Sequence, residues 1–115
     1  MVTQGRGEVS LFIEFFGGSS LIKILDVLLE SKPYSLSKAE ISKKASISKA
    51  ALFQHWKVLE KFKLVEETKK YGKIALFRLN EENVLVQNLR KFELALIKKD
   101  MGLSDADSET VASAN

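Results

Sequence analysis

The sequence predicts a small α+β fold that is mostly α-helical and carries one β-hairpin. Three observations predict it. The apolar residues of segment 48–62 have the spacing of an amphipathic helix. After residue 63 the apolar period changes from about 3.6 to about 2, which is typical of strands. The chain has 115 residues, a length that suits one domain with a modest core.

Segment 48–62 is the helix around which the chain is organised. Ser48 can cap it, and Leu52, Trp56 and Leu59 recur at steps of four and three, which places these three on one face. The opposite face is polar, cationic and aromatic, with Lys49, Phe53, Gln54 and Lys57. An apolar back and a basic front suit a DNA major groove; an ordinary amphipathic helix with a solvated face is the alternative.

Two helices are expected before this one. Residues from Ser19 onward carry a broad apolar face that ends before Pro33, since proline disfavours helix at the preceding residue. Ser37 and Glu40 form a capping box, which starts a short helix that ends near residue 44. A turn of small residues then leads into the central helix, which gives a helix-turn-helix arrangement.

The apolar stretch at 9–16 fits either a strand or a short helix. We favour the helix because two glycines follow it, and glycine is common just past a helix end. The stretch is too apolar to stay exposed, so it should pack on the domain or on a second chain. Residues 1–8 are polar, and we expect a flexible N-terminus there.

Two strands at 64–68 and 74–79 are expected to form a hairpin after the central helix. The turn between them is basic and contains Lys69, Lys70, Tyr71 and Lys73. A basic hairpin directly after a helix of this kind can lie along the phosphate backbone or in the minor groove of DNA.

The last predicted helix begins at Asn80 as its cap, with two acids in its first turn, and runs to about Lys99. Its apolar stripe consists of Leu85, Leu89, Phe92 and Leu96. We interpret the stripe as a dimer contact, shared with the N-terminal apolar segment; the alternative is that the helix folds back on its own domain. The domain would then span 9–101, followed by a disordered acidic tail at 102–115.

The charge distribution favours a polyanionic partner. Residues 32–78 hold twelve Lys or Arg against four acids, a net charge of +8, whereas the tail carries three acids. Little chemistry for catalysis is present, because the chain has no cysteine, one histidine and no glycine-rich phosphate loop. No apolar run reaches the roughly 18 residues of a membrane span. We therefore expect a non-enzyme with no metal, no cofactor and no membrane partner.

In this order of elements, and in segments 16–25, 47–53, 59–65 and 72–80, the chain resembles the winged helix-turn-helix transcriptional regulators. The likeness is to the broad group that includes the ArsR and MarR families, and most to small archaeal members. It covers roughly residues 16–80, with a looser match for the last helix. The resemblance implies dimeric, sequence-specific binding to double-stranded DNA, with the central helix in the major groove and the hairpin as the wing.

Site residues follow from this resemblance taken together with the charge and apolar patterns. The bases would be contacted by Lys49, Ala50, Phe53 and Gln54. The DNA backbone would be contacted by Ser37, Lys38, Lys43, Lys44, Ser48, Lys57, Lys69, Lys70, Tyr71 and Lys73. The dimer interface would contain Leu11, Phe12, Phe15, Leu85, Leu89, Phe92 and Leu96.

Two positions depart from the pattern of these regulators. Lys63 stands where they have a glycine, so it should adopt a left-handed backbone. Gln54 stands where they often have arginine, and glutamine suits adenine more than guanine.

We expect a homodimeric repressor that is cytoplasmic and associated with the nucleoid. The sequence identifies no small-molecule effector. Two alternatives stay open: a winged-helix module that binds other proteins, and an architectural or plasmid-partition DNA-binding protein.

Overall fold

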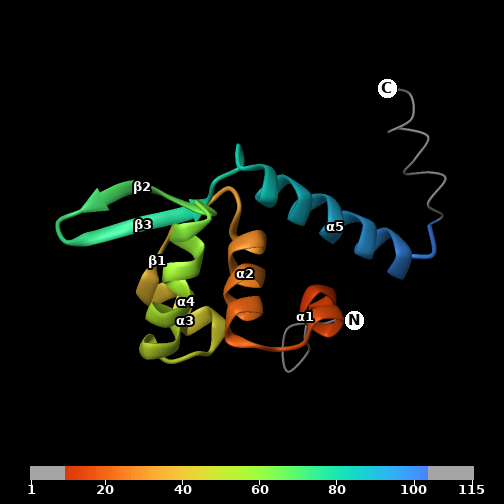
Figure 1. The fold of residues 1–115 in the computed structure, drawn as a ribbon, viewed down its shortest axis with the longest axis horizontal. Helices are drawn as coiled ribbons and strands as arrows, with labels where there is room; N and C mark the ends of the chain where they lie inside the picture. The colour runs from red at the N-terminus through yellow and green to blue at the C-terminus, as the bar shows by residue number, and fades with distance from the viewer. Residues whose placement is uncertain (1–9, 104–115) are drawn as a thin grey trace.

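The structure is a computed structural model that describes residues 10–103. Its elements are α1 (Leu11–Phe16), α2 (Ser20–Ser31), β1 (Leu36–Ser37), α3 (Lys38–Ala45), α4 (Lys49–Lys61), β2 (Val65–Tyr71), β3 (Ile74–Leu79) and α5 (Val84–Asp100). The predicted flexible N-terminus and nearly all of the predicted tail lie outside the described residues. Figure 1 shows the β2–β3 hairpin on one side of the α2–α4 block, and α5 extending to the other side.

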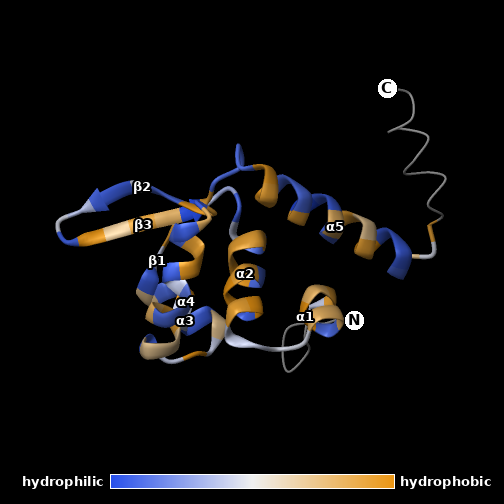
Figure 2. Cartoon of the chain, viewed as in Figure 1, coloured by the Kyte–Doolittle hydropathy of each residue, from blue (hydrophilic) through white to orange (hydrophobic). Residues whose placement is uncertain are grey.

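The hydrophobic core lies where α2, α3 and α4 meet. Ile24 of α2, Ile41 of α3 and Leu59 of α4 are fully buried, and Trp56 is only 2% exposed. In Figure 2, α2 is hydrophobic over most of its visible length, whereas α5 alternates between the two colours. The apolar face predicted for the central helix is therefore confirmed as its packing face.

Serine side chains cap the first four helices, as the sequence indicates for several of them. The hydroxyl oxygens accept the N–H of the residue three positions on, at Ser10, Ser19, Ser37 and Ser48. The capping box is complete, because the Ser37 N–H also donates to Glu40 Oε1 at 2.8 Å. Local sequence thus determines where these helices begin.

The N-terminal apolar segment is a helix, as favoured over a strand. The Ser10 hydroxyl donates to Asp26 Oδ1 at 2.7 Å and so ties α1 to α2, while burial raises the pKa of the Asp26 carboxyl. Phe12 differs from its expected place in a dimer interface. It is 2% exposed and belongs to the core of its own chain, so its side chain is not available to a second one.

The sheet contains one strand more than the sequence predicts. The strand order is β1-β3-β2 and all pairs are antiparallel. β2 also runs further than expected, to Tyr71, so Lys69 and Lys70 belong to the strand and not to the turn. The turn shortens to two residues because Gly72 adopts a positive φ of 60°. A bulge separates Glu67 from Lys69 in the ladder.

The last helix begins three residues later than predicted, and Asn83, not Asn80, is its N-cap. The Asn80 side chain accepts the N–H of Glu82 at 3.1 Å, and the Asn80 N–H donates to Leu64 O at 2.8 Å. These bonds form a turn that keeps Glu81 outside the helix. The predicted cap and first turn were wrong because Asn83 caps the helix instead, with its side chain held by Phe62 O and Lys63 O.

Lys63 has a φ of 57°, which confirms the left-handed backbone expected there. Replacing Lys63 by glycine removes the Cβ penalty of about 1–2 kcal/mol, part of which the greater freedom of unfolded glycine offsets. We predict that Lys63→Gly raises the free energy of unfolding by about 0.5–1 kcal/mol in urea titrations. The matched control, Lys61→Gly in helix α4, should lower it by a similar amount. A lower free energy of unfolding in Lys63→Gly than in the wild type would contradict a strained backbone at Lys63.

Candidate nucleic-acid interface

The flank of α4 opposite the core is exposed along its first three turns. Lys49, Ala50, Gln54 and Lys57 are all exposed, and Phe53 is 58% exposed although it is a large apolar residue. The only acid in α4 is Glu60, in its last turn. The side chains proposed from the sequence to contact bases therefore share one accessible surface without carboxylates among them.

The turn between α3 and α4 places further cations beside this flank. Lys43 and Lys44 are exposed in the last turn of α3. Ser46 ends α3 with a left-handed φ of 57°, and the Ile47 N–H donates to Ser42 O at 3.0 Å. This tight turn brings the two lysines close to Ser48, which caps the N-terminus of α4 and keeps its hydroxyl proton available to donate.

The wing lies next to the start of α3. A groove is lined by residues of both elements: Ser37, Lys38, Ala39, Lys73, Ile74, Ala75 and Phe77. Lys69, Lys70, Tyr71 and Lys73 are exposed. Because successive strand residues point to opposite faces, Lys69 and Lys70 cannot both face the same surface. At the other end of the wing, Arg78 Nε bonds Glu66 Oε2 at 2.8 Å, so this cation is paired within the chain.

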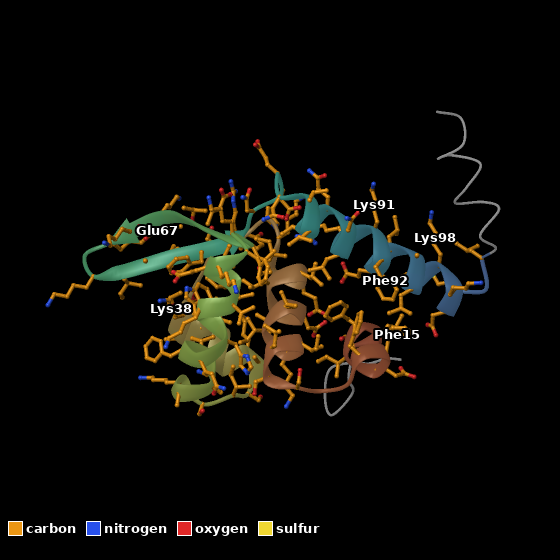
Figure 3. All side chains as sticks on the ribbon, viewed as in Figure 1. Phe15, Lys38, Glu67, Lys91, Phe92 and Lys98 are labelled. Carbon is orange, nitrogen blue, oxygen red and sulfur yellow. The ribbon has the colours of Figure 1, made fainter. Side chains whose placement is uncertain are left out.

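The Lys38 side chain packs against aromatic rings, whereas the sequence predicted only a phosphate contact for it. Its ammonium nitrogen lies 5.1 Å from the ring centre of Trp56, 5.5 Å from that of Phe77 and 5.7 Å from that of Phe53. Cation–π attraction at these distances joins α3, α4 and β3. Figure 3 shows Lys38 beside the α3–α4 pair, on the side nearer the wing. Lys38 therefore connects the wing to the exposed ring of Phe53, and the sequence pattern gave no signal of this cluster.

A second surface, at the other end of the molecule, is apolar. The rings of Phe15 and Phe16 lie 5.2 and 5.3 Å from the ring of Phe92, with Phe15 60% and Phe92 36% exposed. Figure 3 shows Phe15 and Phe92 facing each other across α1 and α5. An open groove continues this surface between α5 and the end of α4, lined by Phe16, Phe62, Leu64, Leu85, Asn88, Leu89 and Phe92.

Of the residues expected in a dimer interface, Phe15 and Leu85 are exposed and Phe92 partly so, while Leu11, Leu89 and Leu96 are half-buried. The sequence did not single out Phe16 and Phe62, which are 45% and 48% exposed. Phe16 is the last residue of α1 and Phe62 is the C-cap of α4. The position of each ring on this surface therefore depends on where its helix ends.

Two further structural findings concern metal binding and membrane-spanning helices. Within residues 10–103, no three His, Cys, Asp or Glu side chains are grouped so that they could hold a metal ion. None of the helices in this part of the chain is long and apolar enough to cross a membrane.

The elements α2 to β3 define a winged helix-turn-helix fold, with α4 in the place of the recognition helix and β2–β3 as the wing. No protein-family model matches the sequence, and no curated protein matches it.

Solved structures match the fold as a whole. NMB1585, a MarR family regulator from Neisseria meningitidis, is 19% identical with a TM-score of 0.57, and the match covers 90% of this chain and 82% of that one. A variant of ZitR from Lactococcus lactis in apo form is 18% identical with a TM-score of 0.56, covering 88% and 82%.

MepR, a transcription regulator of the Staphylococcus aureus multidrug efflux pump MepA, is 13% identical with a TM-score of 0.53, covering 89% of this chain and 77% of that one. At these identities the likeness concerns the fold, and it extends beyond residues 16–80.

Proposed function

We propose that this chain is a sequence-specific DNA-binding transcriptional regulator that acts as a homodimer. One observation carries the proposal: the exposed flank of α4 holds cations, an amide and an aromatic ring, and Lys38, whose ammonium lies over that ring, lines a groove together with Lys73 of the wing. Duplex DNA is the partner that such a basic, groove-sized helix fits. The fold shared with solved transcription regulators supports the same assignment.

Base recognition is assigned to the first turns of α4. Gln54 can bond the N6 and N7 edge of adenine, and Phe53 can contact a thymine methyl group. Ala50 lets the helix approach the bases closely, and Lys49 can donate to guanine or to a phosphate. Lys38 acts here through its contact with Phe53, since its ammonium lies over that ring.

Phosphate contacts are assigned to exposed donors around this flank. They are Lys43, Lys44, Ser48, Lys57, Lys70, Tyr71 and Lys73, together with the half-buried Ser37 and with Lys69 on the other face of the wing. These contacts hold the register of the protein on DNA and contribute affinity without reading sequence. Two copies joined through α1 and α5 would place two α4 helices in successive major grooves. In the cytoplasm, such a dimer binds a promoter within the nucleoid. It represses transcription by blocking access to that promoter.

The DNA surface can be tested with a site selected by the wild-type protein from random duplexes. Gln54→Ala should weaken binding to that site by about 5- to 150-fold, as expected for a lost bidentate base contact of about 1–3 kcal/mol, and leave binding to random duplex unchanged. Lys70→Ala should weaken both and reduce the slope of log K against log salt by about one. Fluorescence anisotropy from low to moderate salt measures both effects.

The exposed lysine Lys91 of α5 lies outside the proposed surface and provides the control substitution, Lys91→Ala. If Gln54→Ala and Lys70→Ala bind like the control, the surface is assigned wrongly. If the wild-type chain is monomeric and binds no duplex at low salt, a protein-binding module becomes the better description.

The dimer surface can be tested with two leucines of α5. Leu85 and Leu94 are 45% and 53% exposed and lie nine residues apart, which places them on opposite sides of the helix. Light scattering should give the wild type about twice the 12.9 kDa of one chain. Leu85→Glu should convert it to monomer, because a carboxylate in an apolar contact is costly to desolvate. Leu94→Glu should remain dimeric, and a dimeric Leu85→Glu would contradict the assignment.

A further inference from the structure

The start of α5 is bonded directly to the end of α4. The Asn83 side chain donates from Nδ2 to Phe62 O at 2.8 Å and to Lys63 O at 2.7 Å. Its Oδ1 accepts the N–H of Leu85 at 2.8 Å and so caps α5. The two carbonyls point to Asn83 because the chain leaves α4 through the left-handed turn at Lys63. One amide side chain therefore joins the two helices end to end.

A second connection lies two turns further along α5. Arg90 donates from Nε and Nη2 to the Glu81 carboxylate at 2.7–3.1 Å, and from Nη1 to Leu29 O at 3.0 Å. These bonds attach α5 both to the segment before it and to the last turns of α2. The hydrogen bonds from Arg90 hold the pKa of the Glu81 carboxyl below its ordinary value, so the pair is ionised at neutral pH.

Few other contacts fix the direction of α5 near this junction, whereas further along the helix Phe92 packs against Phe15 and Phe16 of α1. Val86 is its one fully buried side chain among the described residues, and the later part of the helix packs against α1. Figure 1 shows α5 leaving the junction with the sheet and running over α2 toward α1. Asn83 and Arg90 therefore hold the angle between α5 and the block that carries α4.

This angle matters for a dimer that binds DNA. If two chains are joined through α5 and α1, a rotation at the junction moves each α4 relative to its twofold mate. The base-contacting end of α4 lies 12 residues from its C-terminal end, or about 18 Å at 1.5 Å per residue. A rotation of about 11° then moves that end by about 3.5 Å, which is close to one base-pair step of B-DNA.

We propose that Asn83 and Arg90 are positioning residues that fix the spacing between the two DNA half-sites selected by the homodimer. The inference rests on the proposed function and adds to it a determinant of specificity that touches no DNA. Asn83 acts by holding the end of α4, and Arg90 by holding α5 on the last turns of α2. Loosening either connection lets the dimer accept half-sites at more than one spacing.

The test uses the best duplex selected by the wild-type dimer, together with duplexes in which one or two base pairs are inserted or removed at its centre. Arg90→Met keeps the aliphatic stem and removes the guanidinium. Asn83→Ser keeps a good N-cap and removes both bonds to the carbonyls of α4. Lys91→Met, at an exposed position of α5, is the matched control for Arg90→Met.

The wild type and Lys91→Met should lose about tenfold or more in affinity for each base pair added or removed, since the second helix then misses its bases. In Arg90→Met and Asn83→Ser this loss should fall to about threefold or less, or the best spacing should change. Arg90→Lys should recover part of the wild-type preference, since lysine keeps the charge but not the bidentate geometry. Circular dichroism and light scattering confirm folded dimers before the measurement.

Two results would overturn this inference. If both variants are folded dimers that bind every duplex more weakly than the wild type by the same factor, their spacing preference is unchanged. Their role is then only structural, and the proposed function stands. If the wild type binds no duplex, the proposed function fails and the inference fails with it. Because Asn83→Ser and Arg90→Met break different connections, poor folding of one leaves the other to decide.

Discussion

The burial of one edge of α4 is the constraint on which the rest of the molecule depends. Leu52, Trp56 and Leu59 are each at most 2% exposed. Burying each of these side chains contributes about 1.5–3 kcal/mol, and a small domain has only about 5–15 kcal/mol of net stability. A half-turn of the helix about its axis would expose all three, so the core determines which flank of α4 faces solvent. The polar flank is exposed as a consequence of packing on the other side.

The same packing also positions the wing. The Trp56 ring meets the Phe77 ring of β3 edge-on, with centroids 5.0 Å apart and planes at 75°. Lys38 lies over both rings and over Phe53. Core, wing and exposed flank are thus connected through one aromatic cluster. A partner that binds the α4 flank therefore meets a surface already ordered in the free protein, which lowers the entropic cost of binding.

Much of the fold could be predicted because its signals are local. Helix caps depend on a hydroxyl and an N–H three residues apart, and Ser48 fulfilled this. The left-handed Lys63 followed from one residue standing in the place of a glycine. The misplaced start of α5 shows the limit: Asn80 has a good capping side chain, but it closes a local turn, and Asn83 caps the helix while bonding two carbonyls at the end of α4.

Residues whose role depends on distant partners could not be predicted in this way. In a helix of six residues, periodicity cannot distinguish a side chain buried in its own core from one that contacts a second chain, and Phe12 is of the first kind. Lys38 looked like one more exposed cation, because nothing in the sequence places three rings around it. Asn83 and Arg90 carried no signal, since Asn83 bonds carbonyls at the end of α4 and Arg90 bonds Leu29 O of α2 together with the Glu81 carboxylate nine residues away.

The most direct measurement of the central claim is a titration of the isotopically labelled protein with duplex DNA at low salt, followed by the amide chemical shifts of each residue. We predict that the largest changes fall on residues 49–57 of α4, on the α3–α4 turn and on the wing around residues 69–73, with little change in the second half of α5. Changes confined to α1 and α5, or no changes at all, would contradict this prediction.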